Sequence, residues 1–170
     1  MKDEVSICIV GIGGQGIVFA TSILAQTLFE QGYYVSQLQS YGAEVRGGAV
    51  IGWVVYSNKP IECPFIDEFD VLIVLHQSGY RECLKRNIKG RTIIVDEDLV
   101  PEPPPNAKKL PMNREVEKRN LRGLTNMVAL GVLSALGYID YKVLREVVLR
   151  RKGGEMNVKA LEVGLNIMKK

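Results

Sequence analysis

The sequence is short of the residues that hold metal centres. Cys8, Cys63, Cys83 and a single histidine, His76, are spread over 170 residues, and no two cysteines form a Cys-x-x-Cys pair. An iron–sulfur cluster ordinarily takes four thiolates, and a zinc site takes three or four side-chain ligands. We therefore expect neither kind of centre within this chain. Cys8 lies inside an apolar run and is interpreted as a core residue.

Long apolar runs and a strong charge imbalance are also absent. The 22 basic and 19 acidic residues give a net charge of +3, which offers no electrostatic reason to expect a nucleic-acid partner. No apolar run approaches the length of a membrane span and no cationic-then-apolar leader opens the chain. We therefore expect a cytoplasmic protein with no membrane partner. The length of 170 residues and the 46% hydrophobic content predict one domain, 1–170, with a sizeable core.

The chain does have a glycine-rich loop between a strand pattern and a helix pattern. Val5 to Val10 is a continuous apolar run typical of a buried parallel strand, and Ile17 to Gln31 is predicted as a helix ended by Gly32. The loop reads Gly11-Ile12-Gly13-Gly14-Gln15-Gly16. Glycines allow positive φ and close backbone approach, and the start of a helix offers N–H groups to a phosphate or carboxylate. This Rossmann-like βα unit therefore predicts an anion-holding loop.

A second polar glycine loop follows the second predicted strand, Tyr34 to Gln39. It reads Ser40-Tyr41-Gly42-Ala43-Glu44-Val45-Arg46-Gly47-Gly48. In an open α/β sheet the ligand crevice lies outside the carboxyl ends of the strands, so we expect both loops at one rim. Arg46 can grip a phosphate or carboxylate with two hydrogen bonds. Alternatively, Glu44 and Arg46 pair with each other or with a neighbouring subunit.

The remaining pattern predicts a doubly wound α/β fold with a mostly parallel sheet, a β-hairpin insertion and a helical C-terminal part. Three consecutive prolines, Pro103 to Pro105, predict an extended connector because they fix φ and lack donors. The expected strands are Ala49 to Tyr56, a hairpin return over Ile61 to Cys63, Val71 to Leu75, Thr92 to Val95 and Lys108 to Pro111; the expected helices are 79–86, 115–119, 124–136, 140–151 with Asp140 as N-cap, and 158–168.

Titratable side chains follow two of these strands. His76 comes after Val71 to Leu75, where it either faces the crevice or serves as a capping or loop residue. Asp96 and Asp98 follow the next strand. They are either cation ligands or, more commonly at such places, solvated turn acids.

Gly11, Gly13 and Gly16 match the G-x-G-x-x-G dinucleotide fingerprint in its strand-to-helix context. An NAD site also needs an acid at the end of the second strand, about 20 residues on. That strand ends Gln37-Leu38-Gln39-Ser40, without a carboxylate. A stand-alone NAD(P)- or flavin-binding Rossmann oxidoreductase is therefore the alternative, and glycines that only permit close helix–strand packing are a further interpretation.

Taken together, the two glycine motifs resemble the gamma subunit, or fused gamma domain, of the 2-oxoacid:ferredoxin oxidoreductases. The resemblance runs on through Asp70-Val-Leu-Ile-Val-Leu75 to Val95-Asp96 and covers about the first 100 residues. It implies one part of an assembly that oxidatively decarboxylates a 2-oxoacid with coenzyme A to acyl-CoA, carbon dioxide and reduced ferredoxin. Ile12 and Gly47-Gly48 resemble the 2-oxoglutarate type more than the pyruvate type.

The resemblance also implies where the cofactors are. The family uses thiamine diphosphate, Mg²⁺ and iron–sulfur clusters, but this sequence has no Gly-Asp-Gly signature and no four-cysteine set. We therefore expect no cofactor on this chain alone, no catalytic residue in it, and alpha, beta and ferredoxin-like delta subunits as partners. A two-loop rim would face coenzyme A, substrate or partner; it consists of Gly11, Gly13, Gly14, Gln15, Gly16, Tyr41, Gly42, Glu44, Arg46, Gly47, Gly48 and His76.

Overall fold

Six strands form one sheet in the computed structural model, which describes residues 4–44 and 47–169. Across the sheet they are β2 (Tyr34–Tyr41), β3 (Ala49–Ser57), β1 (Glu4–Ile12), β4 (Glu68–Val74), β5 (Lys89–Asp96) and β6 (Lys108–Leu110). β3 is antiparallel to both of its neighbours, and the other neighbouring pairs are parallel. The mostly parallel sheet is thus confirmed, with β3 as its one reversed strand among the described residues.

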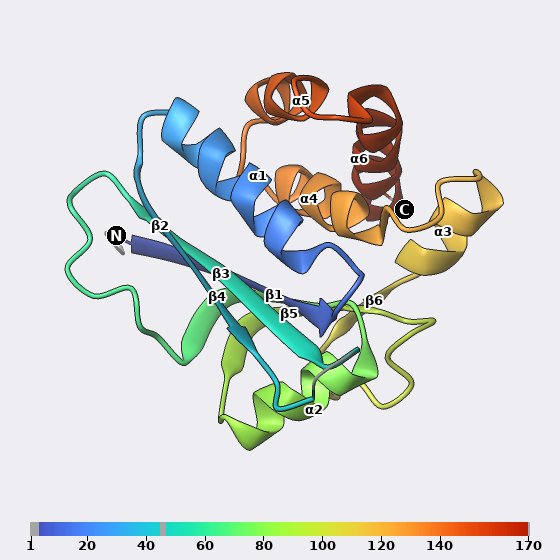
Figure 1. The fold of residues 1–170 in the computed structure, drawn as a ribbon, viewed down its shortest axis with the longest axis horizontal. Coiled ribbons are helices and arrows are strands. Elements are labelled where there is room, and N and C mark those ends of the chain that lie inside the picture. The colour runs from blue at the N-terminus through green and yellow to red at the C-terminus, as the bar shows by residue number, and fades with distance from the viewer. Residues whose placement is uncertain (1–3, 45–46, 170) are drawn as a thin grey trace.

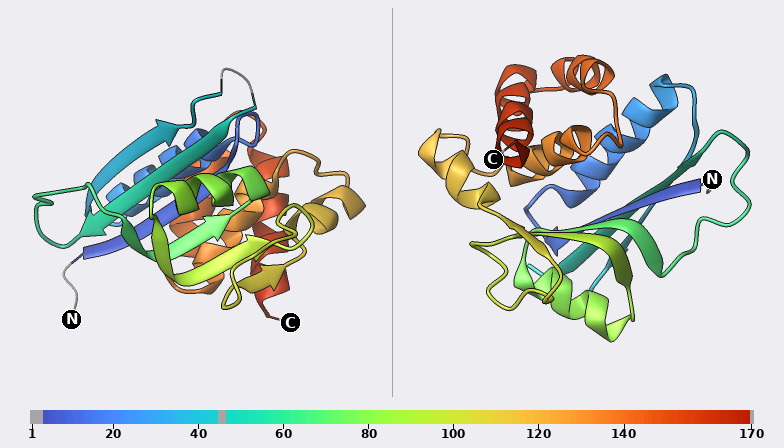
Figure 2. Two further views of the ribbon diagram at one scale, coloured as in Figure 1. Left: turned by 90° about the horizontal axis from the view of Figure 1, so that it is seen from below. Right: turned by 180° about the vertical axis from the view of Figure 1, so that it is seen from behind.

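Helices cover both faces of this sheet, as Figures 1 and 2 show. One face carries α1 (Ile17–Glu30) and α4 (Thr125–Ala135), with α5 (Tyr141–Leu149) and α6 (Gly154–Met168) outside them; α2 (Gln77–Lys85) covers the other, and α3 (Met112–Lys118) follows β6. No helix of the described chain is long and apolar enough to cross a bilayer.

The apolar run of β1 supplies both faces, because alternate side chains of a strand point to opposite sides. Ile7 and Ile9 belong to the larger apolar cluster under α1 and α4. Cys8 and Val10 belong to the smaller cluster under α2, together with Cys83. Cys8 is fully buried, which confirms its interpretation as a core residue.

The β-hairpin lies one loop earlier than predicted. β3 folds back on β2, with Tyr41 opposite Val50, so the second glycine loop is the hairpin connection. The predicted return strand at Ile61 to Cys63 is not formed. Because β2 and β1 already pair with the two edges of β3, no edge of that strand is left for a third partner.

The helical C-terminal part forms as predicted, with small shifts of its boundaries. The expected inward face of α4, which includes Met127, Leu130 and Leu133, is fully buried. Asp140 caps α5 by accepting a hydrogen bond from the N–H of Val143 at 3.0 Å. α3 and α6 each begin a few residues before the predicted starts.

Candidate functional site

The first glycine loop is held in shape by a side chain of its own. Oε1 of Gln15 accepts a hydrogen bond from the N–H of Ile12 at 2.9 Å, and Nε2 donates to the carbonyl of Leu75 at 3.1 Å. Leu75 directly follows β4, so the Gln15 amide ties the loop to the neighbouring strand end. Both amide atoms therefore serve the chain's own backbone, a use that the sequence did not indicate.

The glycines of this loop divide into two kinds. Gly11 is buried at the end of β1, and a Cβ there would meet the Gln15 amide. Gly16 has φ +69°, and a Cβ there would meet Asn126 of α4, whose Nδ2 donates to the Gly16 carbonyl at 3.1 Å. Gly13 and Gly14 are exposed, and Gly14 has φ +92° with open space around it. The burial of Gly11 shows that it serves close packing, and its predicted place on the partner-facing rim stays a prediction.

The second glycine loop meets the first, which confirms that the two lie at one rim. The N–H of Gly13 donates to the carbonyl of Gly48 at 3.0 Å, and the N–H of Gly42 closes the hairpin on Ala49 at 2.7 Å. Glu44 folds back over this loop, since a Cβ on Gly42 or Gly48 would come within 2.7 or 3.0 Å of a Glu44 carboxylate oxygen. Val45 and Arg46 lie outside the described residues, so the predicted role of Arg46 stays a prediction.

His76 follows Leu75 at the same rim and begins α2. Its Nδ1 accepts a hydrogen bond from the N–H of Ser78 at 3.1 Å, so the imidazole caps the helix. Partial burial lowers the pKa of His76 below its ordinary value, which favours the neutral ring that this acceptor role requires. Of the two predicted placements, the capping one is confirmed.

Two hollows flank the joined loops. One, of about 340 Å³, is mainly apolar and lies on the α1 side; it is lined by Ile12, Gly13, Gly14, Gly16, Ile17, Val18, Phe19, Tyr41 and Val50. The other, of about 280 Å³, lies on the α2 side and is polar; it is lined by Glu44, Gly47, Gly48, Ala49, Ser78, Arg81, Glu82 and Lys85. The rim thus offers an aromatic surface on one side and charged side chains on the other.

Arg81 and Lys85 are basic residues of this rim that the sequence analysis missed. Both lie on α2, and each is partly paired: Arg81 with Glu102 at 3.2 Å and Lys85 with Glu82 at 3.6 Å. The sequence did contain a signal for their position, because the helix predicted at 79–86 follows a predicted strand, and such a helix starts at the carboxyl-end rim of the sheet. The basic residues of 79–86 could have been placed there on that ground.

Asp96 differs from the solvated turn acid that was the commoner expectation. Its side chain is fully buried, where Oδ1 accepts from the N–H of Asp98 at 3.0 Å and Oδ2 from the N–H of Asn113 at 2.8 Å. Burial raises the pKa of Asp96 to about 6, although the two N–H donors act in the opposite direction. Asp98 instead pairs with Arg114 at 2.6 Å. The Asp96 carboxyl therefore anchors the start of α3 against the end of β5.

The described residues do not fit a metal or iron–sulfur centre. Within 4–44 and 47–169, no three His, Cys, Asp or Glu side chains converge as metal ligands would. Cys8 and Cys83 are buried under α2, and burial raises the pKa of both thiols, whereas Cys63 is exposed.

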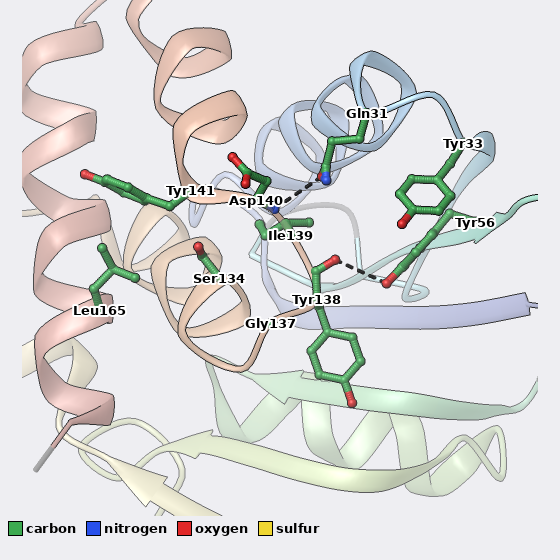
Figure 3. Close-up of a pocket in the computed structure, with 10 residues that line it drawn as sticks. All are labelled: Gln31, Tyr33, Tyr56, Ser134, Gly137, Tyr138, Ile139, Asp140, Tyr141 and Leu165. Atoms are coloured by element: carbon green, nitrogen blue, oxygen red, sulfur yellow. Dashed lines mark hydrogen bonds between the residues drawn. The ribbon is translucent and has the colours of Figure 1, made fainter. Parts of the chain in front are cut away.

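A further hollow, of about 610 Å³, is shown in Figure 3 and has none of the glycine-loop residues in its lining. Among its lining residues, Tyr56 pairs with Val5 and Val35, near the starts of β1 and β2, whereas the glycine loops follow the ends of those strands. The Tyr56 hydroxyl donates to the carbonyl of Tyr138 at 3.2 Å, and burial raises the pKa of Tyr56 to about 12. Its hydroxyl thus joins the sheet to the α4–α5 connection.

Comparison with known proteins identifies the family to which this chain belongs. Residues 6–167 match the family described as pyruvate ferredoxin/flavodoxin oxidoreductase. The chain belongs to that family.

Its relatives include subunits of one type of enzyme. The chain is 36% identical over 173 residues to the 2-oxoglutarate synthase subunit KorC of Archaeoglobus fulgidus, covering 98% of this chain and 89% of the relative. It is 40% identical over 151 residues to the KorC subunit of Methanocaldococcus jannaschii, covering 84% and 79%.

Two solved structures have the same fold. The keto/oxoacid ferredoxin oxidoreductase gamma subunit from Geobacter sulfurreducens matches with a TM-score of 0.78 at 31% identity, over 95% of this chain and 96% of the other. The 2-oxoglutarate:ferredoxin oxidoreductase from Magnetococcus marinus, solved with 2-oxoglutarate, coenzyme A and succinyl-CoA bound, matches with a TM-score of 0.86 at 25% identity. This chain corresponds to 32% of that longer chain, while the match covers 99% of this one.

Proposed function

We propose that this protein is the gamma subunit of a 2-oxoacid:ferredoxin oxidoreductase that acts on 2-oxoglutarate. The complex oxidatively decarboxylates the 2-oxoacid with coenzyme A to acyl-CoA and carbon dioxide, and ferredoxin takes up the electrons. The observation that carries the proposal is the match to KorC subunits of 2-oxoglutarate synthase over 98% of this chain. The gamma-subunit structure from Geobacter sulfurreducens supports the same assignment, because the match covers 95% of this chain and 96% of that one.

In this proposal the redox chemistry belongs to companion alpha, beta and ferredoxin-like delta subunits. Those subunits hold the thiamine diphosphate, the Mg²⁺ and the iron–sulfur clusters. For the clusters the reason lies in this chain, because the thiols of Cys8, Cys63 and Cys83 are too few to ligate one. This chain contributes a rigid rim to the assembly, and the isolated subunit is inactive.

Reconstitution from separately produced subunits tests the proposal. The complete complex should reduce ferredoxin with 2-oxoglutarate and coenzyme A, while omission of this chain should abolish that activity. Pyruvate offered at the same concentration should react more slowly. Full activity of the complex without this chain would overturn the proposal.

The alternative, a stand-alone NAD(P)- or flavin-binding oxidoreductase, is disfavoured by the sheet order. In the dinucleotide fold the acid that binds the ribose lies at the end of β2, next to β1. Here the antiparallel β3 stands between β1 and β2, and Gln37 donates its amide to Thr21 of α1 at 3.2 Å. Calorimetric titration of the isolated chain with NAD⁺, NADP⁺ and FAD distinguishes the two functions. A gamma subunit should bind none of the three, whereas tight binding of one of them would support the stand-alone oxidoreductase.

We also propose that the two-loop rim contacts coenzyme A in the assembled enzyme. Coenzyme A combines a planar adenine ring with phosphate groups, and the rim combines the aromatic side chains of Phe19 and Tyr41 with the basic side chains of Arg81 and Lys85. α1 begins at this rim with no side-chain cap on its first N–H groups. Gly13, Gly14 and Arg46 are the other proposed contacts.

Kinetics of the assembled complex test the coenzyme A contact. Arg46→Ala should raise the KM for coenzyme A, and Phe19→Ala should do the same through the other side of the rim. Arg150→Ala is the matched control, because Arg150 pairs with Glu30 at the opposite end of α1. If Arg46→Ala leaves the KM values for coenzyme A and for 2-oxoglutarate unchanged but weakens assembly on size exclusion, the rim binds a partner subunit and the coenzyme A contact is wrong.

A further inference from the structure

The two edges of the sheet are built differently. β6 forms one edge with three residues, of which Lys108 and Lys109 are exposed. A short edge strand with lysines is a common protection against pairing with another chain. β2 forms the other edge with eight residues, Tyr34–Tyr41, and has no charged residue and no proline. That edge lacks both protections.

The uncharged stretch around β2 is unusual for its place in this chain. Residues 31–43 contain no Asp, Glu, Lys or Arg, although charged residues make up 24% of the sequence. Comparable uncharged stretches at 5–29, 47–58 and 123–139 contain the largely buried β1, β3 and α4. β2 has no fully buried residue. β2 therefore has the uncharged composition of a buried strand, but in the single chain its side chains are only partly buried or exposed.

The outer side of β2 is available for backbone pairing from Val35 to Gln39, whereas the outward carbonyl of Tyr41 already accepts a hydrogen bond from Arg86 at 2.8 Å. The N–H of Gly42 donates to the carbonyl of Ala49, so the even-numbered residues of β2 hydrogen-bond to β3. In an antiparallel pair the residues between them direct their backbone groups the other way. Val35, Gln37 and Gln39 therefore present N–H and C=O groups at the open edge.

Aromatic side chains extend this edge at the start of the strand. Phe29 is 70% exposed and Tyr34 is 53% exposed. Together with Gly32, Tyr33 and Val35 they line a hollow of about 490 Å³. Exposed aromatic side chains beside the open edge of a strand are typical of a protein interface.

We propose that β2 is a self-association surface, on which a second copy of this chain adds its own β2 in antiparallel orientation about a two-fold axis. An isologous contact requires a self-complementary surface, and a strand without charges places no like charges opposite each other. With the axis at Leu38, that residue lies opposite its own copy, Gln37 opposite Gln39, and Ser36 opposite Ser40. In this register an apolar side chain lies opposite an apolar one, an amide opposite an amide, and a hydroxyl opposite a hydroxyl. This inference goes beyond the proposed function and does not depend on it.

Sedimentation equilibrium of the purified chain tests the surface. The wild-type chain should form a dimer, and Gln39→Lys should give a monomer by adding to β2 the kind of charge that protects β6. Gln39→Pro should do the same without loss of fold, because the N–H that it removes faces the open edge. Leu84→Lys is the matched control: Leu84 is 60% exposed on α2, so this variant should stay dimeric.

A disulfide tests the register. Residues opposite each other in a non-hydrogen-bonded antiparallel pair have Cα atoms about 4.5 Å apart, which a disulfide can bridge. Leu38→Cys in a Cys63→Ser background should therefore form a covalent dimer under mild oxidation. Ser36→Cys in the same background should not, because Ser40 lies opposite it.

Three outcomes would overturn the proposal. A wild-type chain that is monomeric at every concentration would do so, as would a Gln39→Lys variant that stays dimeric through another surface. The third is hydrogen exchange at Val35, Gln37 and Gln39 that slows only when companion subunits are added. In that case the strand pairs with a companion subunit and not with a second copy.

Discussion

The backbone N–H of Gly13 donates a hydrogen bond to the carbonyl of Gly48 across 3.0 Å. Gly13 follows β1 and Gly48 precedes β3, so this bond joins two loops that are separated by a helix and a strand in the sequence. The Gln15 amide extends the connection to Leu75 at the end of β4. The rim is therefore one hydrogen-bonded unit across three strands, and a change in one loop should be felt in the other.

Gln15→Ala should destabilise the fold by about 2 kcal/mol, since it removes two side-chain hydrogen bonds of about 1 kcal/mol each. The N–H of Ile12 and the carbonyl of Leu75 both lose their side-chain partner. The free energy of unfolding in urea measures the effect. Gln15→Glu is the informative companion, because a carboxylate keeps the acceptor for Ile12 but places a negative charge beside the Leu75 carbonyl. Equal stability of Gln15→Ala and wild type would show that the amide does not hold the loop.

Gly131→Ala should destabilise the fold by about 2 kcal/mol, because α4 and α6 cross at this residue and overpacking typically costs that much. A Cβ on Gly131 would meet the carbonyl of Leu161, and one on Gly164 would meet the carbonyl of Val128. The better helix propensity of alanine offsets only part of this cost. Ser134→Ala on the same helix is the control and should change the melting temperature little. A neutral Gly131→Ala would mean that the two helices separate without cost.

Much of the fold could be predicted from local pattern. The buried strands are continuous apolar runs, and Gly32, with φ +93°, ends α1 as its position in the sequence indicated. The position of β3 could not be predicted in this way. Its sequence fits a strand equally well in a hairpin with Ile61 to Cys63 or with β2, and the choice depends on contacts between segments far apart in the chain.

The site was predicted at the level of loops rather than atoms. Both glycine loops were expected at one rim, and the bond from Gly13 to Gly48 places them there. That Gly11 and Gly16 serve packing depends on the approach of Gln15 and Asn126, and residue 126 is remote in sequence from both glycines. The burial of Asp96 likewise depends on the start of α3, which supplies the N–H of Asn113. Only the approach of Gln15 to Gly11 is local; the contacts of Gly16 with Asn126 and of Asp96 with Asn113 join residues that are remote in sequence, and no local pattern contains them.

Asp96 should make stability fall with pH between about 4 and about 6. Burial raises the folded-state pKa of this carboxyl to about 6, above its ordinary value in the unfolded chain. Between the two values the folded state holds the proton and the unfolded state has lost it, so the free energy of unfolding decreases as pH rises. The contribution is complete below the unfolded pKa and is lost as pH passes the folded one. The slope is at most about 1.4 kcal/mol per pH unit.

The comparison of wild type with Asp96→Asn isolates this contribution. Asparagine does not titrate, so the difference in free energy of unfolding between the two proteins should decrease from pH 4 to pH 6 and then level off. Urea midpoints at half-unit pH intervals provide the measurement. Glu68→Gln serves as the control, because Glu68 is an exposed partner of Arg91 beside the start of β5, away from Asp96 at its end. A difference that is constant with pH would show that Asp96 keeps an ordinary pKa in the folded state.

Arg86→Ala should release the second glycine loop. The Arg86 guanidinium donates to Ser40 Oγ at 2.6 Å and to the carbonyl of Tyr41 at 2.8 Å, while Nε pairs with Glu82 at 2.7 Å. This side chain thus fixes the end of β2 to the end of α2. Without it, the amides at 42–44 should exchange with deuterium faster, while those of β1 keep their wild-type rates.

Arg86→Lys should not restore slow exchange, because an ammonium group lacks the planar fork that reaches both acceptors and Glu82 together. Arg91→Ala is the matched control for loss of a surface charge: Arg91 pairs with Glu68 at 3.1 Å, at the opposite end of the parallel strands. Its removal should leave the loop unchanged. If Arg86→Ala and Arg91→Ala give the same exchange rates at 42–44, the loop is held by its bond to Gly13 alone, and α2 does not control it.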